Sequence, residues 1–123
     1  MGTGGHRPVR PGPWRDCQLD ITSPAALRSL LERERPGTVV FCAYDQASRA
    51  VTVDAPARAA AVAAKLGARF VFISTDLVFD GKTGHYTETD RPAPLLAYGA
   101  MKAEAELQVR SEHASAVVLR ASL

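Results

Sequence analysis

The sequence predicts an α/β fold over residues 19–123, with its strands in a doubly wound parallel sheet. Short apolar runs, typical of buried parallel strands, alternate with longer stretches of helical character. Glycine or proline marks the change from helix to strand, at Pro36-Gly37 and at Gly67. The length of 123 residues and the 46% hydrophobic content fit one globular domain. Alternation of this kind builds parallel sheets with right-handed crossovers.

The first 18 residues are expected to form an irregular segment rich in proline and glycine. Three of the residues from 8 to 13 are prolines, which prevents a helix there. The first helix follows, because Ser23 is suited to the N-cap and Pro24 to the first helical position. This helix leads to a buried strand predicted over residues 38–43.

Four further elements and a long loop complete the prediction. An alanine-rich helix spans residues 55–66, and a strand spans residues 69–74. The loop over residues 76–96 has no clear secondary structure, and such a length in a compact domain indicates either function or disorder. A helix over residues 97–113 and a strand over residues 115–120 close the pattern.

Hydroxyl, phenol and ammonium groups follow one another late in this pattern. Ser74 and Thr75 end a strand, where an open α/β sheet binds its ligands. Tyr98 and Lys102 lie four residues apart on a helix and therefore share a face. A cation beside a phenol lowers its pKa from the ordinary value of about 10 toward the range useful for acid–base catalysis. We predict that one of the two hydroxyls holds a substrate carbonyl and that Tyr98 protonates its oxygen as a nicotinamide delivers hydride.

A solvated surface pair is the alternative for Tyr98 and Lys102. It is the usual explanation of a bare Y-x-x-x-K match, so the spacing by itself is weak evidence. The order of hydroxyl, tyrosine and lysine on strand, loop and helix favours the catalytic interpretation.

The run from Ile73 to Lys102 (ISTDLVFDGKTGHYTETDRPAPLLAYGAMK) resembles the signature of the dTDP-4-dehydrorhamnose reductases. These are sugar-nucleotide enzymes of the extended short-chain dehydrogenase/reductase superfamily. A looser likeness extends from Asp20 to Arg120. The resemblance implies a Rossmann-like domain, NADPH or NADH as hydride donor, and a 4-keto-6-deoxy sugar nucleotide as substrate.

Carried over residue by residue, the resemblance assigns roles around the signature. It implies that Thr75 polarises the substrate carbonyl and that Tyr98 is the acid. Lys102 is implied to lower the tyrosine pKa and, with Tyr98, to contact the cofactor at the nicotinamide ribose. Ser74 and Asp76 are expected to bind substrate, with loop capping as the alternative for Asp76.

The resemblance also implies cofactor contacts on two earlier segments. Asp20 and Ile21 correspond to the adenine-contacting pair of the family, although a cap for the following helix explains Asp20 equally well. Cys42 and Ala43 end a strand beside the expected cofactor crevice, where relatives have small residues. Tyr44 is bulky for its place there.

The sequence departs from the family at both ends and near the site. No hydrophobic strand with G-x-G-x-x-G opens the chain, and the glycine cluster in residues 1–6 is expected to be a flexible terminus rather than a phosphate loop. Leu77 stands where the family has a tyrosine, and Thr52 where many relatives have an asparagine. We therefore expect a partial domain that lacks the first strand–helix unit and the C-terminal substrate domain, and that binds NADPH weakly or not at all by itself. The alternative is a non-catalytic sugar-nucleotide-binding or regulatory module, or a truncated remnant of the family.

The composition gives little support to other functions. A formal net charge of +2 is too small to indicate nucleic acid, and the scattered cysteines and histidines indicate neither a disulfide framework nor a metal site. Cys42 is expected to be a core residue of its strand. No apolar run of about 18 residues indicates a membrane, and no signal-peptide pattern indicates secretion, so a cytoplasmic location is expected. An exposed sheet edge would favour an oligomer.

Overall fold

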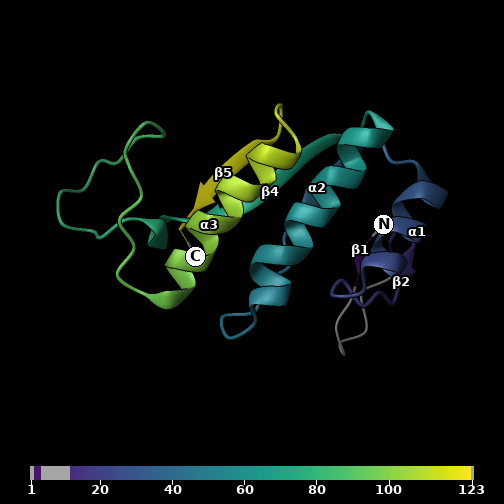
Figure 1. Ribbon diagram of the computed structural model, residues 1–123, viewed down its shortest axis with the longest axis horizontal. Coiled ribbons are helices and arrows are strands. Elements are labelled where there is room, and N and C mark those ends of the chain that lie inside the picture. Colours follow the sequence, from purple (N-terminus) through teal and green to yellow (C-terminus); the bar gives the residue numbers. More distant parts are fainter. Residues whose placement is uncertain (1, 4–11, 123) are drawn as a thin grey trace.

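The structure, a computed structural model, describes residues 2–3 and 12–122. Its main sheet has three parallel strands in the order β3-β4-β5, formed by Thr38–Phe41, Arg69–Thr75 and Val117–Ala121. A helix lies in each connection between them, so the predicted α/β class and parallel sheet are confirmed (Figure 1). The other elements are β1 (Gly2–Thr3), β2 (Asp16–Cys17), α1 (Pro24–Glu34), the π-helix η1 (Ala50–Asp54), α2 (Ala55–Leu66), the 3-10 turn η2 (Asp76–Val78) and α3 (Ala97–Glu112). None of the described helices is long and apolar enough to cross a bilayer.

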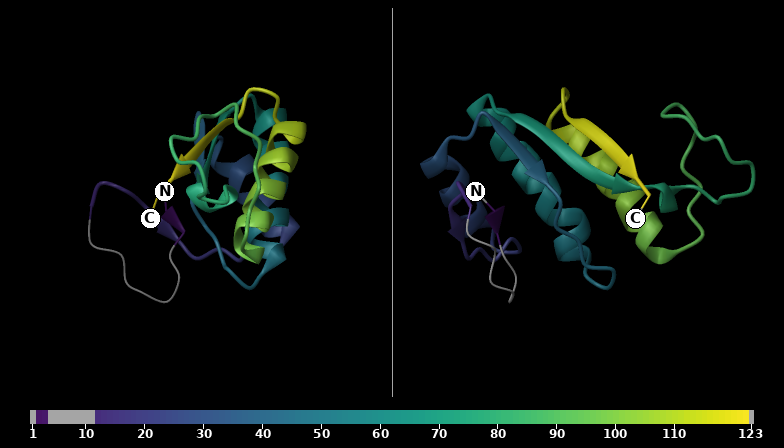
Figure 2. Two further views of the ribbon diagram at one scale, coloured as in Figure 1. Left: turned by 90° about the vertical axis from the view of Figure 1, so that its left-hand side faces the viewer. Right: turned by 180° about the vertical axis from the view of Figure 1, so that it is seen from behind.

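The three α-helices lie in one layer against one face of the main sheet (Figure 2). The strands send Phe41, Phe70 and Phe72 toward this layer, where they are buried among alanines of α2. Side chains alternate between the faces of a strand, and on the opposite face Val40 is 56% and Val117 50% exposed. The described part of the chain is therefore a parallel sheet with helices on one face, and none of the described helices covers the other face.

Helix α1 begins where the sequence predicts. The Ser23 Oγ accepts a hydrogen bond from the backbone N–H of Ala26 at 3.3 Å, which is the N-cap arrangement. Leu27 and Leu31 on its inner face are buried. Arg35 then ends the helix in the left-handed conformation, with φ at 43°, and turns the chain toward β3.

The prediction that the first 18 residues are irregular is wrong in part. Gly2–Thr3 pairs in parallel with Asp16–Cys17, forming a separate two-stranded sheet. Proline removes a ladder hydrogen bond only at its own position, so dipeptides outside the proline-rich run can still pair. Residues 4–11, which hold most of the glycine cluster and two of the three prolines, lie outside the described residues.

Strand β3 ends at Phe41, two residues earlier than predicted, and Cys42 is not the core residue expected. Cys42 is exposed, because the chain leaves the sheet there and enters a loop closed by Thr52. The Thr52 Oγ1 donates to the Asp45 carbonyl at 2.6 Å and accepts from the Asp45 N–H at 3.0 Å. A π-helix over Ala50–Asp54, which the sequence did not predict, then leads into α2.

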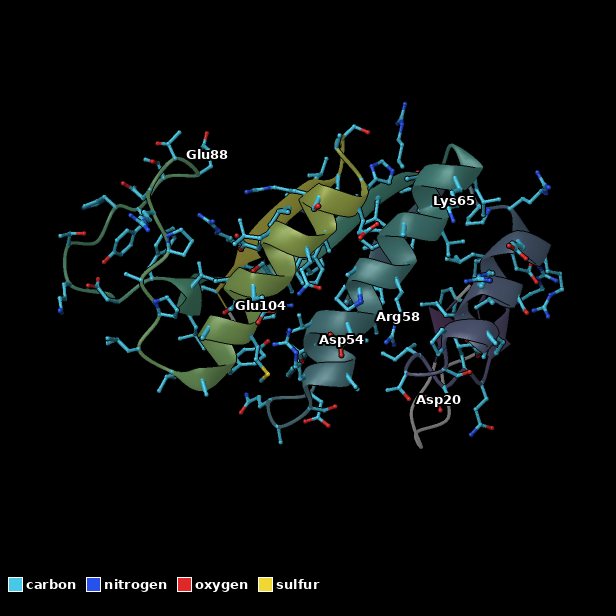
Figure 3. All side chains as sticks on the ribbon, viewed as in Figure 1. Asp20, Asp54, Arg58, Lys65, Glu88 and Glu104 are labelled. Carbon is cyan, nitrogen blue, oxygen red and sulfur yellow. The ribbon has the colours of Figure 1, made fainter. Side chains whose placement is uncertain are left out.

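The long loop after β4 is ordered by its own side chains. The rings of Phe79 and Tyr86 stack with centroids 4.2 Å apart and 4° between their planes. The Tyr86 hydroxyl donates to the Asp80 carboxylate at 2.6 Å. Figure 3 places Glu88 at the top of this loop. These contacts give this part of the loop a defined arrangement.

Candidate functional site

The carboxyl end of β4 carries the predicted hydroxyl pair. Thr75 is buried, and its Oγ1 accepts from the Leu77 N–H at 3.2 Å and donates to the Asp76 Oδ1 at 3.2 Å. Ser74 is 2% exposed, and within the described chain its Oγ has no hydrogen-bond partner. A buried hydroxyl without a partner is costly, so this strand end is suited to receive a polar ligand atom.

A glycine brings the start of α3 onto this strand end. A Cβ placed on Gly99 would lie 2.2 Å from the carbonyl oxygen of Leu77 and 3.1 Å from the Cβ of Pro94. Only a residue without a side chain permits so close an approach. Tyr98, the neighbour of Gly99 in the first helical turn, therefore lies near η2.

Gly99→Ala is expected to destabilise the fold by roughly 1–3 kcal/mol, the range for overpacked sites. The atom it would strike belongs to the backbone, which cannot rotate away. Urea unfolding monitored by circular dichroism measures the loss. Gly37→Ala is the matched control, because a Cβ there meets nothing within 4 Å. Equal unfolding midpoints for the two variants would contradict the proposed packing.

Lys102 is buried against the same strand. It is 2% exposed, its Nζ donates to the carbonyl oxygen of Ile73 at 2.6 Å, and the ammonium lies 4.2 Å from the centroid of the Phe72 ring. Burial lowers the pKa of Lys102 to about 8, although Glu106 and Cys42 act in the opposite direction. The ammonium is therefore fixed one residue before the hydroxyl pair.

Tyr98 is partly buried on the first turn of α3, with its ring centroid 5.8 Å from that of Tyr44. Burial raises the pKa of the Tyr98 phenol, and Tyr44 raises it further. The prediction that Lys102 lowers this pKa is therefore wrong for this structure. Burial and Tyr44 are the groups that act on this pKa, whereas the Lys102 ammonium donates to the Ile73 carbonyl. Tyr98 is therefore protonated at neutral pH, and as a proton donor it is weaker than a free phenol.

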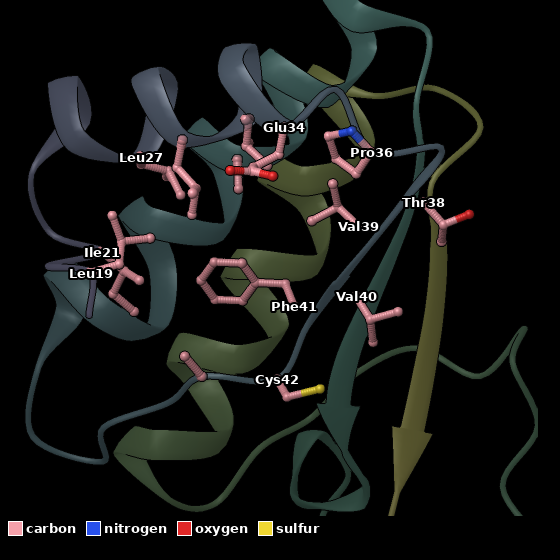
Figure 4. Close-up of a pocket in the computed structure, with 14 residues that line it drawn as sticks. Leu19, Ile21, Leu27, Glu34, Pro36, Thr38, Val39, Val40, Phe41 and Cys42 are labelled. Atoms are coloured by element: carbon pink, nitrogen blue, oxygen red, sulfur yellow. The ribbon is translucent and has the colours of Figure 1, made fainter. Parts of the chain in front are cut away.

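A groove of about 600 Å³ lies between β3 and α1 (Figure 4). Its mostly apolar lining includes Ile21, Cys42 and Ala43, three of the predicted cofactor contacts. Figure 4 shows Phe41 directed toward α1 and Val40 directed away from it. These three residues therefore share the groove beside β3, and the hydroxyl pair lies on the next strand, β4.

Asp20 forms a local turn before α1. Its Oδ1 accepts from the Thr22 Oγ1 at 2.6 Å and from the Thr22 N–H at 2.9 Å, and these bonds hold the pKa of the Asp20 carboxyl below its usual range. The N-cap of α1 is Ser23, so the alternative that Asp20 caps this helix is wrong; its carboxylate instead forms a turn with Thr22 just before the helix.

The described residues fit the nicotinamide and ribose half of a dinucleotide. An ammonium has three N–H donors, and within the described chain Lys102 uses the Ile73 carbonyl as its acceptor, which leaves donors for ribose hydroxyls. The unpartnered Ser74 Oγ is a further polar group nearby. The pyrophosphate half has no matching G-x-G-x-x-G loop in the sequence.

Sequence reasoning missed a buried ion pair behind this site. Glu106 of α3 is 1% exposed and accepts two hydrogen bonds from Arg120 of β5, from its Nε at 3.0 Å and its Nη2 at 2.7 Å. The Arg120 guanidinium also lies 4.9 Å from the centroid of the Phe79 ring. The spacing of four between Lys102 and Glu106 was a signal that both share the inner face of α3.

Comparison with known proteins agrees with this arrangement. The family model described as RmlD substrate binding domain matches residues 6–123. Methionine adenosyltransferase 2 subunit beta from Pongo abelii is 33% identical over 94% of this chain and 37% of its own length. The probable low-salt glycan biosynthesis reductase Agl14 from Haloferax volcanii is 36% identical over 89% of this chain and 41% of its own length. The dTDP-4-dehydrorhamnose reductase from Bacillus anthracis, solved in complex with NADP, has a TM-score of 0.81 and 28% identity, covering 88% of this chain and 44% of that one.

The chain thus spans about two fifths of the length of these relatives. Within that span, the β3-β4-β5 sheet agrees in fold with a solved reductase. The match to the family model covers nearly the whole chain. The chain therefore belongs to the RmlD substrate binding domain family, whose solved structural neighbours here are dTDP-4-dehydrorhamnose reductases.

Proposed function

We propose that this chain carries the catalytic groups of an NAD(P)H-dependent reductase that converts the keto group of a 4-keto-6-deoxy sugar nucleotide into an alcohol. The observation that supports it is convergence on one strand end. The close contact at Gly99 sets Tyr98 beside η2, and Lys102 is bonded to the carbonyl just before the hydroxyl pair. Membership of the reductase family supports the same reaction class.

In this reaction the Thr75 hydroxyl would turn its one proton from the Asp76 carboxylate to the substrate ketone and draw electron density toward the ketone oxygen. The nicotinamide, when bound, supplies the hydride. As the carbonyl π electrons move onto the oxygen, the Tyr98 phenol transfers its proton there and completes the alcohol. The resulting phenolate is reprotonated from solvent. The raised pKa keeps the Tyr98 phenol protonated in this structure, and bound substrate and cofactor would have to lower it for efficient proton transfer.

The remaining predicted contacts take supporting roles in the proposal. Lys102 and Tyr98 would hold the nicotinamide ribose of NADP or NAD, with Cys42 and Ala43 on the neighbouring strand side. Ser74 and Asp76 would bind hydroxyls of the sugar at the end of β4.

A transplantation experiment tests the proposal. The part of this chain that matches the Bacillus anthracis reductase, 88% of its length, replaces the corresponding 44% of that reductase. The chimera is expected to oxidise NADPH with dTDP-4-dehydrorhamnose, followed at 340 nm, whereas the chain by itself is expected to bind NADPH weakly in a fluorescence titration. A folded chimera that binds NADPH without any turnover would refute the catalytic assignment.

A second candidate is a non-catalytic subunit, favoured by the 33% identity over 94% of this chain to methionine adenosyltransferase 2 subunit beta. The outer edge of β3 has no neighbouring strand in the main sheet and would be available to another chain. Sedimentation velocity of this protein mixed with the other subunit of methionine adenosyltransferase 2 distinguishes the two candidates. Co-sedimentation without reductase turnover in the chimera would favour the subunit role.

A further inference from the structure

Two polar anchors fix α3 to the sheet one helical turn apart. The first is the bond from the Lys102 Nζ to the carbonyl of Ile73 on β4. The second is the two-fold bond between Glu106 and Arg120 on β5. Residue 120 is the register partner of residue 74, so the anchors engage neighbouring positions of the sheet. Lys102 and Glu106, four residues apart, both lie on the buried side of α3.

A gain in folding stability is a weak explanation for the buried ion pair between Glu106 and Arg120. Removing a carboxylate and a guanidinium from water costs about as much as their attraction returns, and apolar replacements are often as stable. A more exposed ion pair of the same helix gives the contrast. Glu104, on the solvent side of α3, pairs with Arg49, which precedes η1 (Figure 3). A buried carboxylate one turn from a buried ammonium acts on that ammonium through a medium that screens charge poorly.

The ionisable groups around Lys102 come from each element packed on it. Tyr98 and Glu106 lie on α3, Cys42 follows β3, and Arg120 on β5 is already paired with Glu106. Among these groups Glu106 is the carboxylate that acts on the ammonium.

We propose that Glu106 is a positioning residue for Lys102: held rigidly by Arg120, its carboxylate keeps the buried Lys102 side chain in the ammonium form at neutral pH. The ammonium can then donate to the Ile73 carbonyl and to a ribose in the same state. This inference rests on the proposed cofactor role of Lys102 for its meaning in catalysis. Its test does not depend on that role.

The test is a titration of Lys102 in the full chain by NMR. The chain has three lysines, at positions 65, 82 and 102, so protein labelled with ¹³C at lysine Cε gives three signals, and Lys102→Arg identifies the one of interest. In the wild type, about half of Lys102 is expected to be charged at pH 8. In Glu106→Gln the charged fraction at pH 8 is expected to fall clearly below half. Glu104→Gln, on the solvent side of the same helix, is expected to leave it unchanged.

The direction of change separates the proposal from a structural role. If Glu106 only held α3 in place, its loss would let water reach Lys102, and the charged fraction at pH 8 would rise. A rise or no change in Glu106→Gln would therefore overturn the proposal.

A second variant keeps the proposal testable if Glu106→Gln does not fold. Glu106→Gln/Arg120→Met removes both charges of the pair while roughly keeping their volume, and the charged fraction of Lys102 is again expected to fall. Unfolding of both variants, with Glu104→Gln intact, would assign the pair a structural role and overturn the proposal. No cofactor or substrate enters these measurements, so a chimera without turnover would defeat the proposed function and leave this inference standing.

Discussion

In the chimera with the Bacillus anthracis reductase, Tyr98→Phe is expected to lower kcat by roughly 10²- to 10⁴-fold, the usual contribution of a general acid. The substitution removes one oxygen atom and keeps the ring that contacts Tyr44 at 5.8 Å. Substrate and cofactor contacts to the ring are preserved, so KM is expected to change little. Steady-state oxidation of NADPH at 340 nm measures both constants.

Tyr44→Phe is the matched control for this loss. Its ring is the neighbour of Tyr98, but Tyr44 is 51% exposed and has no assigned proton to transfer. The control is expected to keep kcat within about threefold of the chimera, since a surface hydroxyl contributes little. The Tyr98 phenol stays protonated from pH 7 to pH 9 because its pKa is raised, whereas Lys102 loses its proton around pH 8. The rate of reduction is therefore expected to fall across this range, as the ammonium proposed to hold the cofactor is lost. Similar kcat values for the two variants would remove Tyr98 from the reaction.

Lys102→Met is expected to change how stability depends on pH. The folded-state pKa of Lys102 is lowered from 10.5 to about 8, so burial of the ammonium costs the folded state at most about 3 kcal/mol below pH 8. Between pH 8 and pH 10.5 the unfolded chain binds more protons at this residue than the folded chain. The wild type therefore gains stability relative to Lys102→Met as the pH rises through this window, and the gain ends above pH 10.5.

Urea unfolding at pH 7, 8, 9 and 10 measures this difference between the two proteins. Met has nearly the length of the lysine stem, so the comparison changes the charge and leaves the packing against Phe72 largely in place. Lys65→Met, at the exposed end of α2, is the control and is expected to remain parallel to the wild type at every pH (Figure 3). If the free energies of unfolding of Lys102→Met and the wild type changed in parallel with pH, Lys102 would not have a pKa lowered by burial.

Local signals in the sequence were sufficient for most of the fold. The N-cap at Ser23, the glycine after α2 and the apolar runs of β3 and β4 predicted helices and strands close to their observed bounds. These signals depend on short-range hydrogen bonds and on side-chain periodicity, which neighbours in the chain determine. The π-helix before α2 escaped prediction, because it depends on Thr52 closing a loop back to Asp45.

The sequence by itself determined the candidate groups of this site: Tyr98 and Lys102 share a helix face, and Thr75 ends a strand, since helical and extended repeats set those positions. Only the tertiary structure decided their electrostatics. In the folded chain the buried Lys102 ammonium donates to the Ile73 carbonyl. Burial raises the pKa of Tyr98, whereas the local spacing had predicted a lower pKa. It also joined Glu106 to Arg120, residues on separate elements. Electrostatic energies and pKa values depend on burial and on partners distant in the chain. Burial and those partners exist only after the sheet and its helices have packed.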